Sequence, residues 1–144
     1  MPARDSATLK ERELGVLMAK REHLKRGSKL FTVTFARMDT ANGSACYVIK
    51  TTNTINSFVF YDYFDTTSYL AVKGIVVKPE GETQTTNSDF RKVNGILVPF
   101  EMHQLELPTG QRSTVKLTSL EINVAIDPAL FEPPAAQKKD YRFP

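Results

Sequence analysis

The sequence predicts a mainly β protein with one N-terminal helix. We expect a strongly curved antiparallel meander that forms an incomplete, half-closed β-barrel with the helix on its concave side. Apolar residues recur at helical spacing only before Gly27, and after it they alternate with polar residues as far as residue 126. Short polar turns separate the alternating runs, as in hairpin-connected strands. One helix covers few strands, so such a sheet must curl, close or pair with something else.

Residues 6–25 are predicted to form the helix. Thr8 with Glu11 fits a capping box, and Gly27 is expected to end the segment after a run of basic residues. The apolar stripe is modest, which predicts packing against a sheet on one side only. The side chains in or beside this stripe are Leu9, Leu14, Val16, Leu17, Met18 and Leu24.

Seven strands are predicted after the helix. Asn42-Gly43 and Asn94-Gly95 are strong hairpin-turn signals. Pro99 predicts an edge position or a bulge, because proline cannot donate to a ladder. The apolar alternation changes phase near Thr118, which predicts a bend or bulge in the last strand. The predicted strands are residues 29–38, 45–52, 57–64, 69–78, 83–93, 96–107 and 111–126.

Length and composition are those of one ordinary domain. The 144 residues are 41% hydrophobic and 24% charged, with a net charge of +3. We expect residues 1–134 to form a single domain and residues 135–144 a loose tail, with N-terminal truncation of a longer protein left open. The basic residues at 20–26 are interpreted as a solvated helix end, not as a nucleic-acid-binding stripe.

The sequence contains no membrane-spanning run and no signal-peptide core. Its apolar stretches are too short for a transmembrane helix, and its first 13 residues carry no apolar h-region. A cytosolic protein, a mature form and a fragment all remain open. Cys46 is the single cysteine, so an internal disulfide is excluded.

Catalytic and metal-binding motifs are missing from the sequence, so we expect no enzyme, no cofactor and no metal site. His103 is interpreted as a half-exposed strand residue and Cys46 as a small buried hydrophobe. Asp65 is expected to open a turn through its side chain. Asp62 has two interpretations: a strand-end residue that deters aggregation of a sticky segment, or a polar contact in an apolar cavity.

The third and fourth predicted strands are apolar on both faces. Phe58, Phe60 and Phe64 alternate with Val59, Tyr61 and Tyr63. A one-sided antiparallel sheet would have one polar face. The strands are therefore either a central pair covered on both sides, or a pair with one side lining an apolar ligand cavity.

The order of several segments resembles the LolA/LolB-like lipoprotein-sorting family over roughly residues 40–134. CYVIK (46–50) and YFDTTSYLAVK (63–73) are followed by DFRKVNGILVPFEMHQ (89–104) and VKLTSLEINVAIDPALFEPP (115–134). The resemblance implies an incomplete β-barrel with helices on its concave side. It also implies a periplasmic carrier that binds acyl chains and is not an enzyme.

We therefore expect non-enzymatic binding of a lipid or lipoprotein acyl chain, by a carrier or sensor in the bacterial cell envelope. The expected partner is a lipid or an acylated protein, and not a nucleic acid. The alternative is an interaction module that dimerises or pairs through exposed apolar strands. The residues expected to line the cavity are Phe31, Val33, Phe35, Phe58, Phe60, Phe64, Leu70 and Val72, with Leu17 from the helix as a lid.

Overall fold

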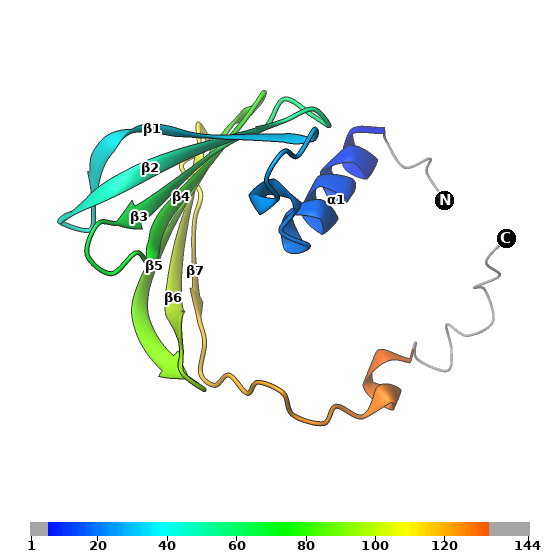
Figure 1. The fold of residues 1–144 in the computed structure, drawn as a ribbon. Coiled ribbons are helices and arrows are strands. Elements are labelled where there is room, and N and C mark those ends of the chain that lie inside the picture. Colours follow the sequence, from blue (N-terminus) through cyan, green and yellow to red (C-terminus); the bar gives the residue numbers. More distant parts are fainter. Residues whose placement is uncertain (1–5, 133–144) are drawn as a thin grey trace, which may run out of the picture.

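The computed structural model describes residues 6–132 and confirms the predicted fold class. One helix, α1 (Ser6–Ala19), precedes a seven-stranded antiparallel sheet whose spatial order follows the sequence. Figure 1 shows α1 inside the curve of this sheet. Within residues 6–132, β1 and β7 are not paired with each other, so the barrel stays open. The strands are β1 (Phe31–Ala41), β2 (Ser44–Asn53), β3 (Val59–Asp65), β4 (Ala71–Lys78), β5 (Gly81–Val93), β6 (Ile96–Leu107) and β7 (Arg112–Lys116).

Tight turns join the strands where the sequence predicts them. Asn42 and Gly43 have φ values of 51° and 78°, and Asn94 and Gly95 have φ values of 48° and 87°. Two successive positive φ values match the twist of antiparallel strands, which is why Asn-Gly is favoured there. Both predicted hairpin turns are confirmed.

The helix is shorter than predicted. It ends at Ala19, and Arg21 takes the left-handed conformation with φ 56° before a 3₁₀ turn, η1 (Glu22–Leu24). This turn places the His23 ring edge-on to Phe31 of β1, with ring centres 6.1 Å apart. The predicted capping box is also wrong, because Thr8 lies inside a helix that already includes Ser6.

The last strand is much shorter than predicted, and Pro99 explains where it stops. Lys116 pairs with Glu101 of β6, and Leu117 donates a final backbone hydrogen bond to Phe100 O at 2.8 Å. In the same register Thr118 would lie opposite Pro99, which has no N–H. Pro99 therefore lies in a stretch of β6 that β7 does not pair with, so this stretch is an edge of the sheet. Residues 117–127 leave the sheet, and a short 3₁₀ turn, η2 (Pro128–Phe131), follows (Figure 1).

The sheet face turned away from α1, here the outer face, has its own buried cluster. Cys46 and Val48 are fully buried there, beside Ala41 and Tyr63. Cys46 is thus the buried small hydrophobe that the sequence predicts. Lys73 Nζ lies 5.3 Å from the centre of the Tyr63 ring, so a long basic side chain lies over one side of the cluster.

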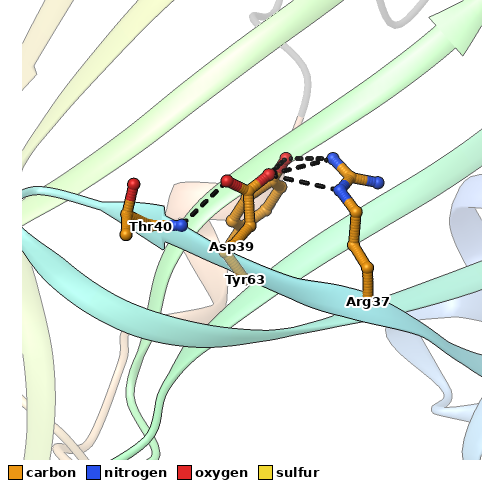
Figure 2. Close-up of polar contacts among 4 residues, drawn as sticks. All are labelled: Arg37, Asp39, Thr40 and Tyr63. Carbon is orange, nitrogen blue, oxygen red and sulfur yellow. Dashed lines mark hydrogen bonds and ion pairs between the residues drawn. The ribbon is translucent and has the colours of Figure 1, made fainter.

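A polar network closes the outer face above Tyr63. Figure 2 shows Arg37 Nη2 donating to Tyr63 Oη at 2.8 Å, while Tyr63 Oη donates to Asp39 Oδ2 at 3.3 Å. Burial raises the pKa of Tyr63. The Thr40 N–H, followed by the Arg37 side chain, lowers the pKa of Asp39. The buried ring thus keeps its hydroxyl satisfied, as a buried polar group requires.

Gly81 is a position where no other residue fits, which gives a first prediction. Its φ is 151°, and a Cβ added there would lie 1.9 Å from Leu107 O. Gly81→Ala is expected to lower the free energy of unfolding by roughly 1–3 kcal/mol, because the backbone of β6 must shift. Chemical denaturation followed by circular dichroism measures the loss.

Gly95→Ala is the matched control for that prediction. Gly95 also has a positive φ, 87°, but nothing lies within 4 Å of an added Cβ. Its substitution tests the backbone strain alone. Equal losses in the two variants would show that the clash with Leu107 contributes nothing.

Candidate functional site

An apolar cavity of about 300 Å³ lies between α1 and the sheet. We call the sheet face that lines it the helix face. Leu14 anchors the helix over this face and is only 3% exposed. The apolar part of the lining consists of Leu14, Gly15, Met18, Phe58, Phe60 and Val76.

Two further features make the cavity suited to an amphipathic molecule. Gly15 leaves free space on the helix side, since nothing lies within 4 Å of an added Cβ. Lys78 Nζ lies 3.5 Å from Glu11 Oε1 and 5.3 Å from the centre of the Phe58 ring. The cavity is therefore mainly apolar, with one charged pair in its lining.

The apolar surface continues beyond the helix as a strip across β1, β2 and β3. Strand pairing places Val33, Thr51 and Phe60 in one row on the helix face. The next row holds Phe35, Ile49 and Asp62, and the following row holds Met38, Tyr47 and Phe64. The apolar strip is defined as Val33, Phe35, Met38, Tyr47, Ile49 and Phe64.

Much of this strip is in contact with solvent. Phe35 is 59% exposed and Met38 52%, and Val33 and Tyr47 are exposed as well. Single exposed apolar residues are ordinary, but neighbours in adjacent rows form a patch of the kind used for binding. The strip and the cavity share the row of Phe60, so they form one continuous surface.

Asp62 lies within this surface. It follows Phe60 and precedes Phe64 on the same face, and it pairs with Ile49 of β2 and Gly74 of β4. Burial raises the pKa of Asp62, and the charge of His23 works in the opposite direction. Asp62 stands in the middle of β3, so its interpretation as a strand-end residue is wrong.

His23 approaches the helix face from η1. Among residues 6–132, its Nδ1 is the fully buried side-chain nitrogen or oxygen without a hydrogen-bond partner. An unpaired buried nitrogen is costly, because it has lost its hydration and gained no bond. His23 thus leaves one buried nitrogen unpaired near this apolar surface, and Asp62 is a half-buried carboxyl within it.

The residues expected at the cavity are distributed over both faces of the sheet and the helix. Phe58 and Phe60 line the cavity, and Phe31, Val33, Phe35 and Phe64 share its face of the sheet. Three others lie elsewhere. Val72 packs on the outer cluster, Leu70 lies in the turn after β3, and Leu17 is half-buried on α1 outside the lining.

Sequence periodicity missed several residues of this surface. Met38 joins it because a bulge between Phe35 and Arg37 shifts the phase of β1 by one residue. Tyr47 shares this face through the regular alternation of β2 with Ile49 and Thr51. Leu14 and Met18 were already in or beside the predicted helical stripe, and their i, i+4 spacing could have identified them as the sheet-facing pair. Gly15 carried no such signal.

Other singled-out residues take structural roles. Asp65 Oδ1 accepts hydrogen bonds from the N–H groups of Thr67 and Ser68, which confirms its turn-opening role. His103 stands exposed on β6, 3.1 Å from Thr114 Oγ1 and 3.0 Å from Glu101 Oε1.

Residues 6–132 contain neither a candidate membrane-spanning helix nor a candidate metal site. No helix in this range is long and apolar enough to cross a membrane. No group of three or more His, Cys, Asp or Glu side chains in the same range is placed to hold a metal ion.

Comparison with known proteins identifies a similar fold. No protein-family model matches the chain, and no curated protein matches it. Among solved structures, the crystal structure of NE2245, a LolA superfamily protein from Nitrosomonas europaea, is similar with a TM-score of 0.50 at 14% sequence identity. The match covers 65% of this chain and 48% of that one, so the chain spans about half of its neighbour's length. The fold is LolA-like.

The raised pKa of Asp62 gives a second prediction. A carboxyl whose pKa in the folded state exceeds its ordinary value of 3.8 destabilises the protein once it ionises. Asp62→Asn is therefore expected to be more stable than the parent at neutral pH. The difference should shrink as the pH falls through the raised pKa and vanish below the ordinary value. Urea denaturation across this pH range measures it.

Asp65→Asn is the control, because its expected effect on stability at neutral pH has the opposite sign. The N–H of Ser68, followed by its hydroxyl, lowers the pKa of Asp65, so its carboxylate stabilises the protein at neutral pH. This variant should lose stability at neutral pH and approach the parent at low pH. A loss of stability at neutral pH in both variants would contradict the assignment of Asp62.

Proposed function

We propose that the helix face binds the apolar chain of an amphipathic ligand, a lipid or the acyl group of an acylated protein, without catalysing a reaction. One observation carries the proposal: the cavity under α1 continues into an apolar strip that the described chain leaves uncovered. A chain lying along this surface would gain about 0.8 kcal/mol for each CH₂ group removed from water.

The LolA-like fold supports the same class of function. NE2245 is described as a LolA superfamily protein, and its similarity to this chain extends to the arrangement of the fold. By the sequence resemblance stated above, we place the chain in the periplasm of a bacterial cell envelope, as a carrier or sensor. Fold likeness alone does not fix a function, so the binding surface has to carry the argument.

The described side chains also favour binding over catalysis. Cys46 is buried on the outer face, where its thiol is not reachable by a ligand on the helix face. His103 lies exposed on β6, and Glu11 in the cavity is paired with Lys78. The Thr114 hydroxyl lies 3.1 Å from His103, but strand pairing sets His103 in one row with Thr86, Lys73 and Tyr63 on the outer face, so this pair does not face a ligand in the cavity.

Filling the cavity from the helix side gives a third prediction. Gly15→Phe would place a ring in the space beside Leu14 and Met18, and phenylalanine is a better helix residue than glycine. We expect the variant to lose most of its binding of an apolar fluorescent probe, N-phenyl-1-naphthylamine, and of fatty acids that displace it. Fluorescence titration of delipidated protein measures both.

Val16→Phe is the control, since Val16 is exposed on the same helix and lies outside the cavity lining. It should bind the probe as the parent does. The proposal fails if the parent binds no probe at micromolar concentration, or if Gly15→Phe binds it unchanged.

Self-association is a second candidate function, favoured by residues 117–127. This segment has the alternation of a strand but leaves the sheet after Leu117. Val124 and Ile126 are exposed, as are Leu130 and Phe131 further on. An unpaired alternating segment beside an open sheet edge is suited to pairing with a second copy.

Light scattering tests this candidate and gives a fourth prediction. If the segment mediates pairing, the parent chain is a dimer at micromolar concentration, and the double variant Val124→Lys/Ile126→Lys is a monomer with an unchanged circular dichroism spectrum. Glu121→Gln, in the same exposed segment, should remain a dimer. A parent that is monomeric at all concentrations excludes the candidate.

A further inference from the structure

The carboxyl group of Asp62 lies among apolar residues of the helix face. Phe60 and Phe64 flank it along β3, and Ile49 lies beside it on β2. On the other side Gly74 adds no side chain, and a Cβ built there would lie 3.7 Å from Asp62 Oδ1. The carboxyl group is therefore framed by apolar side chains and left open on the β4 side.

Asp62 makes no hydrogen bond or ion pair with the residues that the structure describes. Two lysines have other partners: Lys78 lies 3.5 Å from Glu11, and Lys25 lies 2.6 Å from Glu22. Arg26 lines a hollow with His23 and Val33, at the far end of the helix face from Phe64. Lys50 and Lys73 lie over tyrosine rings on the outer face. His23 is the described group whose charge acts on Asp62, and it is not within 4 Å.

From this placement we infer that Asp62 binds the head group of the ligand, and that this head group is a hydrogen-bond donor, with a primary amine as the best-fitting class. The inference rests on the proposed function, because the apolar strip and cavity would hold the attached chain. A carboxylate in apolar surroundings forms strong charge-assisted bonds to an ammonium group. A carboxylate head group would be repelled by the same residue.

His23 adds a second partner for such a head group. Its Nδ1 is unsatisfied among residues 6–132, and a neutral imidazole offers one acceptor nitrogen and one donor nitrogen. An ammonium group has three donors, so it can bond to Asp62 and still serve an imidazole acceptor. A protonated His23 would instead compete with the ammonium group for Asp62.

Head-group selectivity tests the inference and is the fifth prediction. Dodecylamine, dodecanol and dodecanoic acid share one chain length and are titrated, below their aggregation limits, against N-phenyl-1-naphthylamine bound to the full chain at neutral pH. We expect the parent to bind the amine about tenfold more tightly than the acid, with the alcohol between them. Asp62→Asn should abolish this preference while it still binds the probe.

Glu121→Gln removes the same charge at an exposed position and should keep the preference. The inference is overturned if the parent binds amine and acid equally, or if Asp62→Asn keeps the preference. In either case, the proposed function is retained if the parent still binds the probe and the Gly15→Phe variant does not. If the parent binds neither the probe nor any of the three ligands, the proposed function fails, and the head-group inference fails with it.

Discussion

The architecture depends on one constraint: the central strands are apolar on both faces, and one short helix can cover only part of one face. On the outer face Val48 and Tyr63 are buried, and the charged ends of Lys73 and Arg37 lie over the Tyr63 ring. On the helix face, Leu14 covers the sheet near Phe60 and leaves the rows further along β1 and β2 open. The candidate site is the cavity under this helix together with the adjoining part of the sheet that the helix leaves uncovered.

Much of the fold could be predicted because its signals are local. Alternation identified seven strands, and Asn-Gly pairs located two of the turns. The predicted boundaries are wrong where residues distant in sequence determine the structure. Residues 117–126 have the pattern of a strand, but Thr118 would face Pro99, whose missing N–H lies about twenty residues away in sequence. The helix ends before residue 25, since Arg21 takes the left-handed conformation, and His23 then lies edge-on to Phe31, a contact that no local pattern reveals.

The candidate site was predictable in kind but not in detail. Alternation separates the residues of β3 into two faces, but it does not identify the face that meets the helix. It also does not show where a bulge changes the face on which the following residues lie. Val72 lies on the outer face, next to the register shift that the β3–β4 pair makes between Tyr63 and Phe64. Met38 lies on the helix face because of the bulge in β1. Asp62 could be singled out from the sequence, but only the pairing with Ile49 and Gly74 places it within the apolar surface.

The sequential order of the strands has a consequence for how the chain folds. Each strand pairs with the strand that follows it, so every pairing closes a loop of only a few residues. The entropy lost on closing such loops is small, and topologies dominated by local contacts fold quickly. The hairpins at Asn42-Gly43 and Asn94-Gly95 can therefore form independently at opposite ends of the sheet. The strands between them can then pair one after another, starting from either hairpin.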